Sequence, residues 1–268
     1  MLSFFRNEKQ ETLWLKLILY LLVAIPGGAF IFVSIGTLVY IYRPIDYSQI
    51  KMPVSNPGDK HVFVLAHGVR DTTASWSDPL KHELEEKNPD ARVISLEWKP
   101  YSESTLRCSV DGRRIGNIIG KKLAAGKNLE SMHLIGHSCG SFVILGICEA
   151  VKSVRNDVSI QTTYLDPVSV YGGLLWNYGI NRFGGCSDFS DSYIDTGDTI
   201  PGSNDLIPHT ITFDVTAVRE KVKFEGSPHV WPTVYYQQLV RSDKNLELRK
   251  DTHLPSKYSR GVLVKVKS

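Results

Sequence analysis

The segment at 136–140, Gly-His-Ser-Cys-Gly, has the residue types and spacing in this chain that could most directly do chemistry. It follows a short apolar run at 132–135, and Gly136 and Gly140 leave room for a sharp turn between a strand and a helix. A serine hydroxyl is a poor nucleophile at neutral pH, so it needs a base, an acid that orients the base, and donors for an oxyanion. The spacing therefore predicts that Ser138 is an activated nucleophile.

Candidate oxyanion donors follow the first predicted strand, 61–65. His67 and Gly68 would let the backbone turn sharply, and Gly68 would permit close approach of a substrate carbonyl. An ordinary turn between a strand and a loop is the alternative. We expect the backbone N–H groups of Val69 and Cys139 to bind the oxyanion.

Asp166 is the candidate acid, because it ends the predicted strand 159–165 and precedes Pro167, which fixes the backbone as the chain leaves the sheet. An aspartate before proline can also serve only to hydrogen-bond nearby backbone in a turn. Asp214, near the end of the strand predicted at 210–215, is the rival candidate. The other acidic residues of this part of the chain lie in a segment too irregular to place: Asp188, Asp191, Asp195 and Asp198.

The base is expected after the serine and the acid in chain order. Three histidines lie downstream of Asp166: His209, His229 and His253. His209 precedes its predicted strand and so lies at the wrong end of the sheet, and His253 lies in a polar tail. A histidine that only packs near Trp231 is the alternative interpretation of the third. We therefore expect His229 to accept the serine proton.

The elements that must position these residues alternate along the chain. Strands are expected at 61–65, 92–97, 132–135, 159–165 and 210–215, and helices at 77–87, 111–125, 140–154 and around 235–236. This alternation predicts an α/β fold with a mostly parallel sheet and helices on both faces. In such sheets reactive groups gather at the carboxyl ends of the strands, where these candidates lie.

An apolar stretch near the N-terminus predicts a membrane segment. Residues 17–42 carry no charged side chain and lie between Lys16 and Arg43, which is long enough for a helix to cross a hydrocarbon core of about 30 Å. The Pro-Gly-Gly sequence at 26–28 could kink one span or split it into a re-entrant hairpin, and we favour one kinked span. A cleaved signal usually has a shorter apolar region, so we expect an uncleaved anchor. Flanking basic residues favour a cytoplasmic N-terminus and an extracytoplasmic catalytic domain.

The expected organisation is an N-terminal tail at 1–16, a transmembrane segment at 17–42, a proline-containing linker at 43–59 and one catalytic domain at 60–268. The net charge of +3 comes from 31 basic and 28 acidic residues without a dense basic run, so nucleic-acid binding is not expected. The four cysteines lack Cys-x-x-Cys spacing. The sequence permits a Cys108–Cys186 disulfide, but nothing in the spacing favours it. His133 and His137 straddle a strand and its turn rather than one helical face, so neither a metal nor a cofactor is expected.

Together these residues resemble the α/β-hydrolase superfamily, and most closely lipases of the pancreatic-lipase type. The resemblance runs from about 61 to 236 and rests on His67-Gly68, Trp76, the segments 93–98 and 134–140, Leu165-Asp166-Pro167, and His229 before Tyr235-Tyr236. In that family the serine of Gly-His-Ser-x-Gly is the nucleophile, the aspartate of Leu-Asp-Pro is the acid, and a histidine before Tyr-Tyr is the base. This implies Asp166 rather than Asp214. The chain departs from the family in lacking the cysteine-bridged lid and the C-terminal β-sandwich, and in having Glu97 where Asp is common.

The segment 170–208 is expected to form an acyl-binding wall or lid over the active-site mouth, rather than a plain surface loop. Its candidate wall residues are Leu174, Leu175, Trp176 and Tyr178. The sequence thus predicts a membrane-anchored serine hydrolase that cleaves small-molecule or lipid carboxylic esters. An acyltransferase, a thioesterase or a peptidase with the same triad is the enzymatic alternative. A membrane-anchored, non-catalytic binding module that keeps the fold is the alternative of another class.

Overall fold

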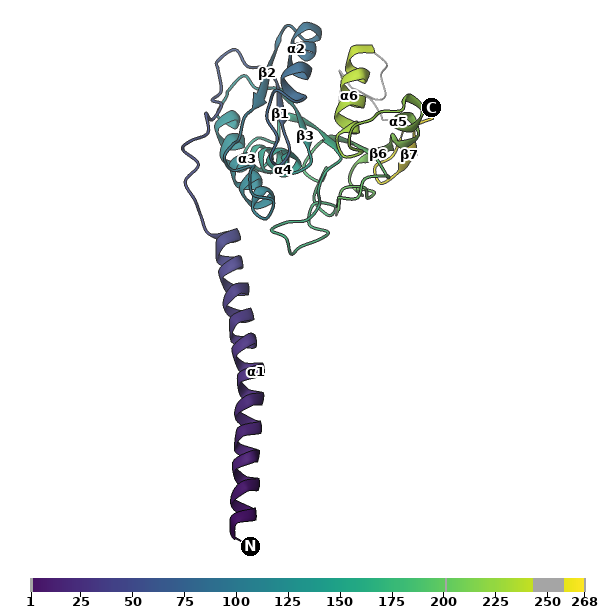
Figure 1. Cartoon of the computed structure of the whole chain (residues 1–268). Coiled ribbons are helices and arrows are strands. Elements are labelled where there is room, and N and C mark those ends of the chain that lie inside the picture. Colours follow the sequence, from purple (N-terminus) through teal and green to yellow (C-terminus); the bar gives the residue numbers. More distant parts are fainter. Residues whose placement is uncertain (1, 201, 243–257, 268) are drawn as a thin grey trace. The chain divides into compact units, whose positions relative to one another are not determined.

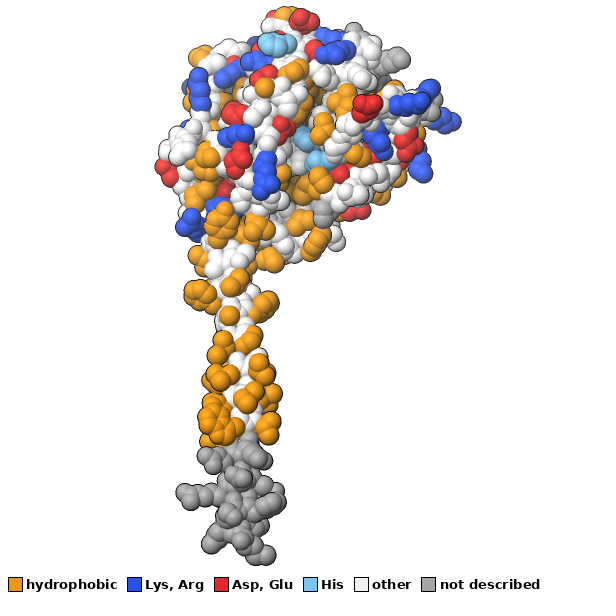
Figure 2. Space-filling view, in the orientation of Figure 1, with side chains coloured by type: hydrophobic (Ala, Val, Ile, Leu, Met, Phe, Trp, Pro, Cys, Tyr) orange, Lys and Arg blue, Asp and Glu red, His pale blue; other side chains and the backbone are white. Residues whose placement is uncertain are grey.

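A computed structural model of the protein describes residues 2–200, 202–242 and 258–267, and the chain divides into two compact units, Met1–Ile45 and Asp46–Ser268. The first unit is helix α1 (Leu2–Tyr42), which continues through Pro26 as one helix, so the hairpin alternative is wrong. Within it, Thr12–Tyr42 is long and apolar enough to cross a membrane, and hydrophobic side chains cover it (Figure 2). A signal sequence can also have this length and composition.

The second unit is built on one parallel sheet. Its strands are β1 (His61–Ala66), β2 (Ala91–Leu96), β3 (Ser131–His137), β4 (Ser159–Leu165), β5 (Phe189–Ile194), β6 (Ile211–Asp214) and β7 (Leu263–Lys265), in the order β2-β1-β3-β4-β5-β6-β7. Its helices are α2 (Ser77–Lys87), α3 (Cys108–Ala124), α4 (Gly140–Lys152), α5 (Thr216–Val222) and α6 (Trp231–Ser242). The pair α3 and α4 packs together on one face, and α2 and α6 cover the other (Figure 1). The predicted α/β fold, with a parallel sheet between helices, is confirmed.

The strand register brings the chemically important positions to one edge. Strands β1 and β3 are paired with Ala66 opposite Gly136, and strands β3 and β4 are paired with His137 opposite Leu165. The carboxyl ends of these three strands are therefore level. The loops that follow β1, β3 and β4 must begin side by side at this edge of the sheet, which is where an open α/β sheet collects its reactive groups.

Helices pack closely on both faces of the sheet beside this edge. On one face, alternate strand residues bury a cluster against α2 and α6 that includes Leu65, Ile135, Leu165, Tyr193, Phe213, Trp231 and Tyr236. On the other face, α3 and α4 touch through their backbones. A Cβ atom on Gly116 would overlap the carbonyl of Val143, and one on Gly146 would overlap the carbonyl of Arg113. Helix α4, which begins at the predicted serine turn, is thus held against both the sheet and α3.

Strand β5 is the main element that the sequence pattern does not predict. Its sequence, Phe-Ser-Asp-Ser-Tyr-Ile, places polar side chains on both faces, which argues against a buried strand. In the fold these groups are paired: Thr163 Oγ1 donates to Asp191 Oδ1 over 2.6 Å, and the hydroxyls of Thr162 and Ser190 lie 2.8 Å apart. Asp191 is therefore a strand residue and not part of an irregular loop. The short elements β7 and α5 are likewise outside the predicted set.

The second unit begins at Asp46, before the expected domain start near Lys60. The Tyr47 hydroxyl donates to Asp111 Oδ1 over 2.9 Å, and the Tyr101 hydroxyl donates to the Asp46 carbonyl over 2.6 Å. Much of the segment expected to be a linker, 43–59, therefore packs as part of the domain.

Candidate active site

Ser138 lies on the turn between β3 and α4, as the sequence predicts. Its backbone has φ of 53°, a left-handed conformation that costs a non-glycine residue free energy and commonly marks functional turns. The Ser138 N–H donates to the Leu165 carbonyl over 3.1 Å, which ties the turn to the end of β4. A Cβ atom on Gly140 would overlap the Ala66 carbonyl, and one on Gly136 would crowd Gly140. The small flanking residues therefore permit the close approach that this turn requires.

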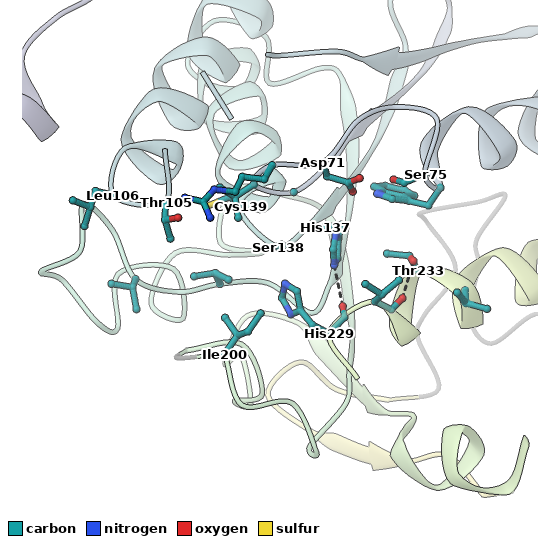
Figure 3. A pocket seen from close by; sticks show the side chains of 18 of the residues that line it. Asp71, Ser75, Thr105, Leu106, His137, Ser138, Cys139, Ile200, His229 and Thr233 are labelled. Atoms are coloured by element: carbon teal, nitrogen blue, oxygen red, sulfur yellow. Dashed lines mark hydrogen bonds between the residues drawn. The ribbon is translucent and has the colours of Figure 1, made fainter. Parts of the chain in front are cut away.

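Asp166 and His229 meet at the same edge. Asp166 directly follows β4 with φ of 43°, and its N–H donates to the Tyr193 carbonyl over 2.8 Å. His229 lies in the turn before α6, and its Nδ1 is 3.0 Å from Asp166 Oδ2. Ser138 and His229 line one cavity (Figure 3). The fold thus brings together the serine, the acid and the base that the sequence names.

A second carboxylate, which sequence reasoning did not place, also contacts the imidazole. Asp198 Oδ2 lies 2.9 Å from His229 Nδ1. Asp198 is buried in the loop after β5, where it accepts hydrogen bonds from the Ser203 hydroxyl and from the Ile200 N–H. An aspartate shortly after a strand is a signal for a candidate acid. Asp198 does not show this signal in the sequence, because β5 itself is not predicted.

Burial and mutual hydrogen bonding shift the pKa values of all three groups. Burial raises the pKa of Asp166 to about 7 against the opposing hydrogen bond from His229. Burial also acts against ionisation of Asp198, but hydrogen bonds from His229 and Ser203 outweigh it and bring its pKa to about 2. Burial disfavours the charged imidazole, yet hydrogen bonds to Asp166 and Asp198 raise the pKa of His229 to about 9. The imidazole is therefore a strong base beside an ionised carboxylate.

The rival candidates have other roles or lie elsewhere. Asp214 Oδ1 accepts from the Thr216 N–H over 3.1 Å and from its hydroxyl over 2.6 Å, so it supports the start of α5. His209 is exposed ahead of β6, at the other end of the sheet from Ser138. His253 lies outside the described residues.

The two predicted oxyanion donors face the cavity. Val69 and Cys139 both line it, and within the described ranges neither backbone N–H has a hydrogen-bond partner. A Cβ atom on Gly68 would lie 3.0 Å from the Ser138 Cβ atom, so the loop after β1 passes directly over the serine. Both N–H groups are therefore free to bind a negatively charged oxygen beside Ser138.

His67 holds this loop in place. It is fully buried, and its Nε2 lies 2.9 Å from Glu97 Oε1 while its Nδ1 lies 2.9 Å from the Gly68 carbonyl. The Trp98 indole N–H donates to the His67 carbonyl over 3.0 Å. Glu97, the departure from the family pattern, therefore has a structural role, because its carboxylate reaches His67.

Replacing Glu97 with alanine is expected to lower kcat/KM for an activated ester by roughly 10-fold, because the loop that carries the Val69 N–H loses its support. Glu97→Gln is the matched control, since its amide oxygen still accepts a hydrogen bond, and it should retain most of the activity. The measurement is initial-rate hydrolysis of a p-nitrophenyl ester. Wild-type kcat/KM in Glu97→Ala would show that His67 needs no partner at this position.

His137, the variable residue of the serine turn, also has a role that the sequence does not indicate. Its Nε2 donates to the His229 carbonyl over 2.9 Å (Figure 3), and the two rings are 4.9 Å apart. Burial lowers the pKa of His137 to about 3, so this ring is neutral. His137 therefore fixes the backbone of the base without adding charge.

Two disulfides brace the site. Cys139, next to the serine, is bonded to Cys108 at the start of α3, and Cys148 of α4 is bonded to Cys186 in the loop before β5. The Cys108–Cys186 pairing drawn from the sequence is wrong, because the close packing of α3 on α4 places Cys108 beside the serine turn.

The cavity above Ser138 has a volume of about 730 Å³. Apolar side chains from separate loops line much of it: Trp76, Leu106, Val168, Trp176, Ile200 and Val230. Polar lining is found beside the serine and at the Arg70, Asp71 and Ser75 positions of the loop after β1. A cavity of this size and lining suits a largely apolar small molecule with a few polar groups at one point.

Only one of the four predicted wall residues contributes to this cavity. Trp176 lines it, while Leu174 and Leu175 are half-exposed residues outside its lining. Tyr178 is also outside the lining and stacks on Tyr171, with ring centroids 4.3 Å apart. The expectation for Leu174, Leu175 and Tyr178 is therefore corrected. Tyr171 and Tyr178 stack on each other at the two ends of this loop, so Tyr178 packs against an aromatic ring without entering the cavity.

The buried cluster also has the donor set of a cation site. Asp166, Asp198 and His229 each offer one ligand atom within 4.8 Å of the others. The distances from His229 Nδ1 to the two carboxylates, 3.0 and 2.9 Å, are those of one imidazole N–H shared by two hydrogen-bond acceptors. His133 is not part of this cluster. Its Nε2 lies 2.8 Å from Thr163 Oγ1, and burial lowers its pKa to about 3.

Comparison with known proteins gives structural matches only. No family model and no curated protein matches the chain. A lipase-esterase related protein from Clostridium acetobutylicum is 12% identical, with 72% of this chain and 96% of that chain covered and a TM-score of 0.41. The ydeN gene product from B. subtilis is 14% identical, with 67% and 98% covered and a TM-score of 0.41. Est1E from Butyrivibrio proteoclasticus is 11% identical, with 69% and 90% covered and a TM-score of 0.38.

These TM-scores are low, so the fold assignment depends on the sheet and the serine turn rather than on the matches. The sheet is parallel, with β3 between β1 and β4 in its interior and helices on both faces. A serine with positive φ lies between β3 and α4. A hydrogen-bonded Asp–His pair lies at the same carboxyl edge of the sheet. The second unit of this chain has the α/β-hydrolase fold.

Proposed function

We propose that this protein is a serine hydrolase that cleaves carboxylic esters through an acyl-enzyme. One observation carries the proposal: Ser138, on a strained turn, shares a cavity with His229, whose far nitrogen is hydrogen-bonded to buried carboxylates. A serine, an adjacent base and an orienting acid are the parts that activate a hydroxyl nucleophile.

The proposed reaction has two acyl-transfer steps. His229 takes the proton of Ser138 as the serine oxygen bonds to the ester carbonyl carbon, and the Val69 and Cys139 N–H groups bind the oxyanion. The ester C–O bond then breaks, and the imidazolium gives its proton to the departing alcohol oxygen. Water, deprotonated by His229, attacks the acyl-enzyme, and the carboxylic acid leaves as Ser138 regains its proton.

The apolar lining of the cavity supports esters with an apolar acyl or alcohol group as substrates. Trp176→Ala is expected to lower kcat/KM for p-nitrophenyl octanoate by roughly 10-fold and to change that for the acetate little, because only a long chain reaches the removed ring. Leu175→Ala is the matched control, since Leu175 lies next in the chain and outside the cavity lining, and it should leave the ratio of the two rates unchanged. Equal losses on both esters in Trp176→Ala would count against a chain-binding role.

We also propose that α1 anchors the enzyme in a membrane and that the catalytic domain is extracytoplasmic. The length and composition of Thr12–Tyr42 support the anchor. The two disulfides support an oxidising compartment, because such bonds are rare in the cytosol.

The decisive test is labelling of the full-length protein with a fluorophosphonate, followed by intact-mass measurement. The wild type should gain one adduct, and Ser138→Ala should gain none. Ser75→Ala is the matched control, because Ser75 is another serine of the same cavity, and it should keep the adduct. A folded wild type that takes no adduct would refute an activated serine. Product analysis with an added alcohol then separates hydrolysis, which gives the free acid, from acyl transfer, which gives a new ester. Rates on thioesters beside esters test the thioesterase alternative.

A further inference from the structure

The base of the site is held by two acids rather than one. Asp166 Oδ2 lies 3.0 Å and Asp198 Oδ2 lies 2.9 Å from the same atom, His229 Nδ1. A neutral imidazole carries at most one hydrogen on this nitrogen, and two neighbouring carboxylates repel each other when both are ionised. The two acids therefore compete for one N–H, and the donors around each acid decide which of them is the better stabilised anion.

The hydrogen-bond donors around each acid distinguish them. Apart from the imidazole, Asp198 accepts from the Ile200 N–H over 3.2 Å and from the Ser203 hydroxyl. Asp166 accepts, apart from the imidazole, only from the Asp195 N–H over 3.2 Å among the described residues. Donors aimed at a carboxylate favour its ionised form. Asp198 is therefore the better stabilised anion, and Asp166 is the acid that holds a proton more readily.

The remaining charged and titratable neighbours do not reverse this order. His137, whose ring packs on His229, is neutral because burial lowers its pKa to about 3. The Asp195 carboxylate is paired with Arg219, with Nε 2.5 Å from Oδ2, so its charge is balanced locally. The directions at the two acids agree with the donor count, because burial raises the pKa of Asp166 to about 7 while hydrogen bonds keep that of Asp198 at about 2.

Building on the proposed function, we propose that Asp198 is the anionic positioning residue that holds the His229 imidazole in its working tautomer, with Asp166 as a second acceptor for the same N–H. When His229 accepts the Ser138 proton, Asp198 balances the imidazolium charge, and Asp166, the more readily protonated acid, contributes less. The sequence assigns the role of the orienting acid to Asp166 and leaves Asp198 without a role. This proposal gives that role to Asp198.

The test compares Asp198→Asn with Asp166→Asn in the full-length protein. We expect Asp198→Asn to lower kcat/KM by roughly 10³-fold, because an amide cannot balance the imidazolium. Asp166→Asn should lower it by less than about 10-fold, because asparagine keeps a neutral oxygen acceptor of the same shape. The dependence of kcat/KM on pH gives a readout that a merely structural role would not move: the apparent pKa of the base should fall in Asp198→Asn and stay near its wild-type value in Asp166→Asn.

Ser203→Ala keeps the inference testable if a buried Asn variant does not fold. The Ser203 hydroxyl donates to Asp198 and to no other carboxylate among the described residues, so its loss should cost a few-fold in kcat/KM. It should also raise the apparent pKa of the base, because a carboxylate that has lost a donor stabilises the imidazolium more strongly. Equal losses in the two Asn variants, a larger loss in Asp166→Asn, or an unchanged pH profile in both Asp198→Asn and Ser203→Ala would overturn the assignment. A labelled wild type with any of these results refutes this inference alone, whereas a folded, unlabelled wild type refutes the proposed function as well.

Discussion

Replacing Ser138 with alanine is expected to reduce ester hydrolysis by roughly 10⁴- to 10⁶-fold, with most of the loss in kcat. The reason is that no covalent intermediate can form without the hydroxyl, while the cavity and the oxyanion donors remain. The backbone at Ser138 has φ of 53°, and alanine must adopt the same strained conformation, so the variant should fold with stability close to that of the wild type.

The measurement is steady-state hydrolysis of p-nitrophenyl butyrate by purified protein, with the thermal midpoint recorded beside it. Ser141→Ala is a suitable control, because Ser141 lies three residues further on in α4 and is buried. Within the part of the chain that the structure describes, its hydroxyl donates to the Gly136 carbonyl alone. It should keep activity within about 10-fold of the wild type, since its hydroxyl bonds backbone and not substrate. Full activity in a folded Ser138→Ala would remove the serine from the mechanism.

The second large effect is expected at His229, in both rate and pH dependence. His229 must be neutral to accept a proton, and hydrogen bonds to Asp166 and Asp198 outweigh burial and raise its pKa to about 9. Since a raised pKa keeps the ring protonated to higher pH, kcat/KM should climb with pH and reach half its maximum well above 6.5, towards 9. His229→Ala should lose roughly 10⁴-fold or more in kcat and lose this ionisation from its profile.

The check is kcat/KM between pH 5 and pH 10 for the wild type, His229→Ala and His209→Ala. His209 is an exposed histidine ahead of β6, so its replacement should leave the profile unchanged. A wild-type profile that is flat above pH 6 would mean that the base is not held by an ionised acid. A retained ionisation in His229→Ala would assign the profile to another group.

The serine turn could be predicted from the sequence because everything that it needs is local. An apolar strand, two small residues and a helix lie within one short stretch, and the clashes that a Cβ atom would meet at Gly136 and Gly140 arise within that stretch and against the adjoining strand. Chain order then leaves three downstream histidines, and their positions relative to the predicted strands select His229. The level ends of β1, β3 and β4 follow from the parallel sheet that the alternating pattern predicts.

Asp198 could not be predicted, because its position depends on a strand whose sequence looks like a loop. The polar side chains of β5 can be buried because threonine hydroxyls on the neighbouring strand β4 bond to them, and β4 is distant in the chain. The cysteine pairs depend in the same way on distant contacts, because Cys108–Cys139 needs α3 beside α4 and Cys148–Cys186 needs the loop before β5 beside α4. The cavity wall does too, because Tyr178 finds a stacking partner in Tyr171 and leaves Trp176 as the wall residue.

The sequence by itself therefore determined the fold class and singled out Ser138, His229 and Asp166, since each depends on local pattern, on chain order or on position relative to a predicted strand. Only the tertiary structure decided that a second acid shares the imidazole, which cysteines pair, and which loop residues line the cavity. Each of these is a contact between segments that are far apart in the chain, and its free energy depends on packing that no local pattern encodes.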